Sequence, residues 1–103
     1  MKKISVIVKE CYENALEKLL YTDGSQIRNH IIKEFDSFVI EPRLCILSRK
    51  CARAWGYPFN VNICGTDFYG TIIIAGLNGG ELTDVLLSID ELKNTFPDLF
   101  PEE

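Results

Sequence analysis

The sequence predicts a single α+β domain, with a mainly antiparallel sheet of four to five strands and two helices. The length of 103 residues suits one hydrophobic core. Residues 71–75 are mostly β-branched and carry no charge, which favours a strand buried on both faces. Other short apolar runs lie between turn residues, and two segments have helical patterns. We therefore expect the sheet to be centred on residues 71–75.

The N-terminal third of the chain predicts a strand, an ambiguous segment and a helix. Residues 3–9 alternate weakly between apolar and other side chains, as a strand does. Residues 11–22 are rich in good helix formers and favour a helix, with a loop and a short strand over residues 16–22 as the alternative. Ser25 is placed to cap a helix over residues 26–35.

The middle of the chain predicts two short strands and a basic connection. Residues 38–40 and 44–47 are apolar and predict strands, the first of which Pro42 ends or kinks. Residues 48–55 are polar and basic, and residues 56–60 have the composition of a turn.

The last third leads through the central strand to a second helix. Residues 61–64 alternate and are expected to run into the central strand. The second helix is predicted over residues 88–96. Ser88 is its N-cap, and Glu91, three residues later, has the spacing of a capping box. Pro97 is expected to stop the helix.

Charge is unevenly distributed along the chain, whose net charge is −4. Residues 1–60 hold ten Lys and Arg against seven Asp and Glu, whereas residues 61–103 hold one against eight. The overall sign argues against general nucleic-acid binding, which depends on neutralising phosphates. No apolar run is long enough to span a bilayer, and the first residues do not resemble a signal peptide. These features predict a cytosolic protein.

The cysteine pattern favours free thiols. Cys11, Cys45, Cys51 and Cys64 form no Cys-x-x-Cys pair, and the single His30 has no ligand spacing to any of them. In a reducing compartment we expect four free cysteines, mostly buried as small apolar groups. The sequence predicts neither a metal site nor a bound cofactor.

From about residue 38 onward, the order of short motifs resembles a known family. The motifs are Glu41-Pro42, Cys45, the turn Gly56-Tyr57-Pro58-Phe59-Asn60, the strand Tyr69-Gly70-Thr71-Ile72-Ile73-Ile74-Ala75-Gly76, and Ser88-Ile89-Asp90-Glu91. They are similar to those of domain of unknown function 3846, a group of small proteins from phages, plasmids and Firmicutes genomes. The resemblance implies a compact α+β domain and a mobile-element origin. It implies no active site, because none is known for the family.

A basic–aromatic segment, residues 43–59, is the strongest candidate for a ligand site. It contains no acidic residue, and its guanidinium groups and aromatic rings suit an anionic, planar partner such as a nucleotide. The alternative is a solvated loop with Trp55 and Phe59 tucked into the core. With nearby polar side chains, the predicted ligand-binding residues are Arg43, Arg49, Lys50, Arg53, Trp55, Tyr57, Asn60, Asp67 and Tyr69.

No catalytic constellation is visible in the sequence. One histidine, with no Ser or Cys at a recognisable elbow, gives no nucleophile–base pair. We therefore expect a non-catalytic binding protein from a phage or mobile element, which sequesters a ligand or blocks a host defence protein. The alternatives are an enzyme that binds or processes nucleotides through residues 43–59, and a nucleic-acid mimic built on the acidic C-terminal half.

The sequence also predicts self-association. The tail after Pro97 carries Leu99 and Phe100, and the basic–aromatic segment carries Trp55. This is more large apolar area than a small domain is expected to bury, and exposed apolar patches often mark interfaces. We expect a homodimer or higher oligomer with the tail or the Trp55 segment in the interface, unless the tail packs on its own core.

Overall fold

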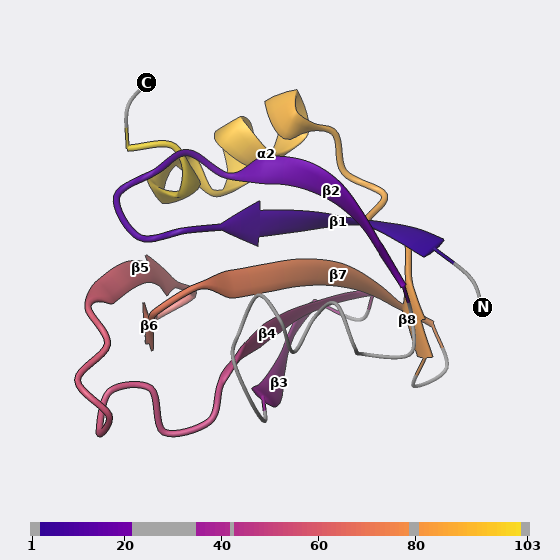
Figure 1. Cartoon of the computed structure of the whole chain (residues 1–103). Coiled ribbons are helices and arrows are strands. Elements are labelled where there is room, and N and C mark those ends of the chain that lie inside the picture. Colours follow the sequence, from indigo (N-terminus) through magenta and orange to yellow (C-terminus); the bar gives the residue numbers. More distant parts are fainter. Residues whose placement is uncertain (1–2, 22–34, 42, 79–80, 102–103) are drawn as a thin grey trace.

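The computed structural model describes residues 3–21, 35–41, 43–78 and 81–101. In these residues the chain forms a six-stranded antiparallel sheet, where four to five strands were expected. Its strand order is β2-β1-β7-β4-β3, and a short strand β8 pairs with the end of β7. Figure 1 shows α2 beside β1 and β2, and the β5–β6 hairpin near one end of β7. The sheet strands are β1 Lys3–Lys9, β2 Leu16–Tyr21, β3 Phe35–Glu41, β4 Leu44–Arg49, β7 Ile72–Asn78 and β8 Glu81–Thr83.

The central strand is confirmed, because β7 pairs with β1 on one side and with β4 on the other. Its successive side chains point to opposite faces, and both faces are buried. Ile72 and Ile74 belong to one core cluster, whereas Ile73 and Ala75 belong to the other. The sheet therefore has apolar packing on both faces, which explains why this strand has no polar alternation.

The predicted helix over residues 11–22 is wrong, and the alternative of a loop and a strand is confirmed. Residues 11–13 form a turn, and β2 then pairs antiparallel with β1 over six residue pairs. Pairing with β1 outweighs the intrinsic helix preference of Leu, Glu and Lys, because propensity is a weak prior beside tertiary contacts.

The predicted helix over residues 26–35 lies outside the described residues, apart from its last position. Phe35 is the first residue of β3 rather than the end of a helix, and Asp36 and Ser37 continue the strand. The strand predicted at residues 38–40 is thus confirmed but is longer at both ends. The described residues contain one α-helix, α2 Ile89–Thr95, where two helices were expected in the whole chain.

Two strand pairings were not predicted. Residues 61–64 do not run into the central strand; instead β5 Phe59–Ile63 and β6 Thr66–Tyr69 form a separate antiparallel hairpin. Its Val61, Ile63 and Phe68 are buried in the first core cluster. Strand β8 was also missed, because three residues between turns carry almost no periodic signal.

The C-terminal helix begins and ends as predicted. The Ser88 hydroxyl accepts a hydrogen bond from the Glu91 backbone at 3.2 Å, and the Glu91 carboxylate accepts from the Ser88 backbone at 3.3 Å. A short 3-10 helix, η1 Pro97–Leu99, follows. The described helices are all too short to cross a bilayer.

The two large apolar side chains of the tail after Pro97 pack on the chain's own core. Leu99 is 0% exposed and Phe100 is 5% exposed, and both belong to the first core cluster. The Leu99 carbonyl accepts a hydrogen bond from the Ala15 backbone at 2.9 Å. Leu99 and Phe100 are therefore not exposed, which is the alternative that the sequence left open for the tail.

Candidate basic–aromatic ligand site

The site is built on the loop that joins β4 to β5, here called the basic–aromatic loop, residues 49–58. Arg49 is the last residue of β4 and is 8% exposed. Its guanidinium lies 4.6 Å from the centre of the Tyr57 ring and 5.7 Å from that of Trp55, and it donates a hydrogen bond to the Tyr57 hydroxyl. A buried cation thus lies against two aromatic faces, a favourable electrostatic arrangement.

Backbone hydrogen bonds fold this loop into a compact turn. The Trp55 amide donates to the Cys51 carbonyl and the Tyr57 amide donates to the Ala52 carbonyl, each at 3.1 Å. Gly56 has φ +82°, a left-handed conformation that glycine adopts without strain. The turn presents Trp55 to solvent with 66% of its surface exposed.

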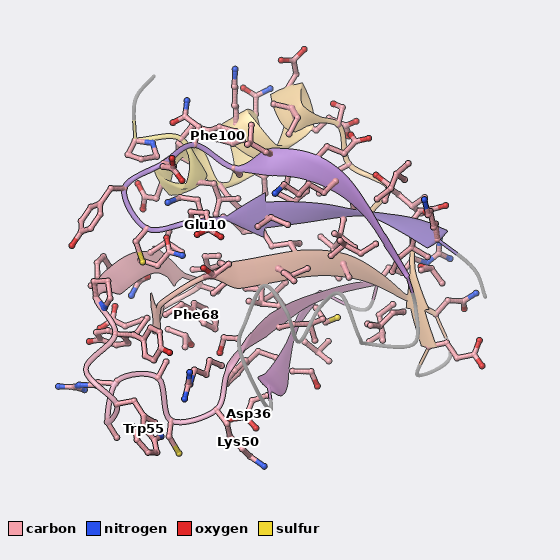
Figure 2. All side chains as sticks on the ribbon, viewed as in Figure 1. Glu10, Asp36, Lys50, Trp55, Phe68 and Phe100 are labelled. Carbon is pink, nitrogen blue, oxygen red and sulfur yellow. The ribbon has the colours of Figure 1, made fainter. Side chains whose placement is uncertain are left out.

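Further cationic and aromatic groups surround the turn. Lys50 and Arg53 are exposed, and the Arg53 guanidinium lies 5.7 Å from the centre of the Tyr69 ring. Phe59, 48% exposed, meets Tyr69 edge-on at 5.8 Å. In Figure 2 Lys50 and Trp55 both project from the loop between β4 and β5. In the alternative of a solvated loop, the part that placed Trp55 and Phe59 in the core is therefore wrong.

The loop also has a shallow hollow beside its buried arginine. This depression of about 270 Å³ is lined by Arg49, Trp55, Gly56, Tyr57 and Pro58. This volume lies just below the range of about 300–1,000 Å³ that is usual for small-molecule sites, so the depression would cover only part of a ligand.

Three predicted site residues are not part of this cluster. Arg43 is exposed in the turn before β4, at the opposite end of that strand from Arg49. Asp67 accepts a hydrogen bond from Asn62 at 2.8 Å within the β5–β6 hairpin. Asn60 is hydrogen-bonded to the backbone of Lys9 and Gly70, so its role is to join segments. The other predicted members gather around the loop: Arg49, Lys50, Arg53, Trp55, Tyr57 and Tyr69.

Sequence reasoning missed a polar cluster at the base of the loop. Lys9 is 1% exposed, and its ammonium donates to the Glu10 carbonyl at 2.7 Å and to Asn60 Oδ1 at 2.9 Å. Burial lowers the pKa of this ammonium, although Cys11 and nearby carboxylates oppose the shift. The Thr71 hydroxyl donates to the Glu10 carboxylate at 3.0 Å. The signal in the sequence that could have indicated this cluster is Lys9, a lysine at the end of an apolar strand.

The cysteines are less buried than the sequence suggested. Cys45 is buried, Cys11 is half-buried, and Cys51 and Cys64 are exposed. Burial raises the pKa of the Cys45 and Cys11 thiols, which favours their neutral forms. Among the described residues, no three His, Cys, Asp or Glu side chains gather as metal ligands would, and His30 lies outside those residues.

Comparisons with known proteins give this site no precedent. No family model, no curated protein and no solved structure matches the chain. The resemblance to domain of unknown function 3846 therefore stays a prediction from the motifs. The class that the fold and the site define is a small, sheet-based domain with an exposed cationic and aromatic loop.

Proposed function

We propose that this chain is a small non-catalytic binding protein that holds an anionic, nucleotide-like ligand on the basic–aromatic loop. The observation that carries the proposal is the exposure of Trp55 beside Arg49, Lys50 and Arg53. Aromatic faces stack on nucleobases, and arginine and lysine pair with phosphate oxygens. A ligand that covered Trp55 would also remove apolar surface from water.

The resemblance to domain of unknown function 3846 supports a proposal for the origin of this chain and for its mode of action. It favours an origin in a phage or another mobile element, and action by sequestering a ligand or by blocking a host defence protein. A protein partner would use the same loop, since tryptophan, tyrosine and arginine are enriched at the energetic centres of protein interfaces. Cytoplasmic action is part of the proposal.

Nucleotide titration followed by tryptophan fluorescence tests the proposal directly. The chain has one tryptophan, so the signal comes from Trp55 alone. We expect one class among mono-, di- and cyclic nucleotides to quench the emission at saturation. Arg53→Gln should weaken that ligand about tenfold, as the loss of one hydrogen bond to a charged group does. Lys18→Gln, which removes an exposed positive charge on β2, should leave the affinity unchanged.

Two outcomes of this titration would contradict the proposal. If all the nucleotides leave Trp55 emission unchanged, the nucleotide-like ligand is wrong. If chromatography shows that a bound nucleotide is converted to product, the alternative of a nucleotide-processing enzyme replaces the non-catalytic function.

The nucleic-acid mimic has less support from the acidic groups themselves. Glu91 completes the cap of α2, and Asp84 accepts a hydrogen bond from the Ser5 backbone at 2.7 Å. Asp67 is bonded to Asn62. These carboxylates have structural partners, whereas a mimic of a phosphate backbone needs a row of acids available to a basic protein.

We propose that the chain self-associates through the Trp55 surface, because Trp55 is exposed whereas Leu99 and Phe100 of the tail are buried. We expect light scattering at micromolar concentration to give at least a dimer mass, and Trp55→Ala to shift the protein toward the monomer. The same interface would be covered by ligand, so a bound nucleotide should also favour the monomer. A monomeric mass for the wild-type protein would show that the predicted oligomer is wrong.

A further inference from the structure

Asn60 lies at a β-bulge beneath the basic–aromatic loop. Across the hairpin Phe59 pairs with Tyr69 and Val61 pairs with Phe68, so Asn60 has no partner strand residue. A bulge of this kind redirects a side chain and often lies beside a functional site. Here it frees the amide of Asn60 for contacts outside the hairpin.

Within the part of the chain that the structure describes, the Asn60 side chain makes three hydrogen bonds, two to Lys9 and one to Gly70. Its Nδ2 donates to the Lys9 carbonyl at 2.8 Å and to the Gly70 carbonyl at 2.7 Å. Its Oδ1 accepts from the Lys9 ammonium at 2.9 Å. Lys9, the last residue of β1, is paired with Ile72, the first residue of β7, so Asn60 is fixed to the end of the two central strands.

A continuous chain of contacts connects Gly70 to the site. The Gly70 amide donates to the Pro58 carbonyl at 2.9 Å, which fixes the end of the loop. A Cβ added at Gly70 would lie 3.2 Å from the Tyr57 ring, so the ring rests on this glycine. Tyr57 in turn contacts Arg49, and Arg49 contacts Trp55.

We propose that Asn60, held by Lys9, is the positioning residue of the basic–aromatic loop. It fixes Pro58 and Tyr57, and through them the spacing of Arg49 and Trp55, before a ligand arrives. The expected consequence of this positioning is tighter ligand binding, and that consequence rests on the proposed function. A loop already held in its bound shape loses less conformational freedom on association.

The test compares Asn60→Ala with Asn62→Ala, a matched change in the same hairpin whose side chain bonds Asp67 instead of the sheet. Time-resolved fluorescence anisotropy without ligand measures the fast local motion of Trp55. We expect a larger fast component in Asn60→Ala and the wild-type value in Asn62→Ala. Nucleotide affinity should fall about tenfold in Asn60→Ala, consistent with losing buried hydrogen bonds.

Two further variants separate positioning from general loss of stability. Lys9→Met removes the ammonium group that donates to Asn60 Oδ1. We expect this variant also to increase Trp55 motion, so it can replace Asn60→Ala in the test if Asn60→Ala does not fold. Leu92→Ala, in α2, destabilises the core without touching this chain of contacts and should leave Trp55 motion unchanged.

The possible failures are distinguishable. Unchanged Trp55 motion in a folded Asn60→Ala protein, or in Lys9→Met if Asn60→Ala does not fold, would overturn the positioning role. If Trp55 motion increases in Asn60→Ala or Lys9→Met, the positioning role is supported. If the wild-type protein also binds no nucleotide, the proposed function is overturned while the positioning role stands.

Discussion

Replacing Gly76 with alanine is expected to destabilise the fold by about 3 kcal/mol or more, as overpacking at a rigid site does. A Cβ at this position would lie 2.1 Å from the Asp84 carbonyl oxygen and 2.7 Å from Thr83 Oγ1. Asp84 cannot easily retreat, because its carboxylate accepts from the Ser5 backbone at 2.7 Å. The clash therefore has to displace β8 from β7 or the segment around Asp84 from β1.

Urea unfolding of Gly76→Ala and Gly65→Ala measures this effect. Gly65 has φ +84° with no atom within 4 Å of an added Cβ, so its replacement costs only backbone strain, about 1–2 kcal/mol. We expect the urea midpoint of Gly76→Ala to fall well below that of Gly65→Ala. Equal midpoints would mean that the Asp84 segment adjusts freely, contrary to the packing described.

Leu99→Ala is expected to destabilise the protein by about 2–5 kcal/mol, the usual cost of truncating a buried leucine. Leu99 is fully buried among residues of α2 and β5–β6, and its carbonyl accepts from Ala15. This loss is a large part of the 5–15 kcal/mol that is typical of a whole domain. Deleting residues 97–103 should therefore unfold the chain rather than dissociate an oligomer.

Leu86→Ala provides the matched control, because this leucine is 73% exposed. Its free energy of unfolding should stay within about 0.5 kcal/mol of the wild-type value. Thermal or urea denaturation followed by circular dichroism measures both variants. If Leu99→Ala were as stable as Leu86→Ala, the tail would not be part of the core.

Sequence reasoning succeeded where the signal is local. The uncharged run in β7 and the Ser88–Glu91 capping box each determine structure through residues close in the chain, and both were predicted. The failures involve pairing between strands, which the composition of one segment does not show. Strand β2 consists of helix-forming residues and becomes a strand because it pairs with β1.

The sequence predicted which residue types make up the candidate site, but not how most of them are placed. The absence of acids around Arg49 and Trp55 was visible in the sequence, and the structure brings these side chains together. The sequence could not show that Arg49 is buried or that Arg43 lies at the other end of β4. Nor could it assign Asn60 a role within the scaffold, because that depends on a bulge.

The strand order has a consequence for how the chain reaches its native state. Hairpins β1–β2 and β3–β4 adjoin only through β7, which comes late in the chain. Isolated two-stranded hairpins are marginally stable in water. Until Ile72–Asn78 has been synthesised, the inner edges of β1 and β4 therefore lack their native partner. Such edges pair readily with other chains, so a nascent or truncated chain that ends before β7 is the form most prone to aggregate.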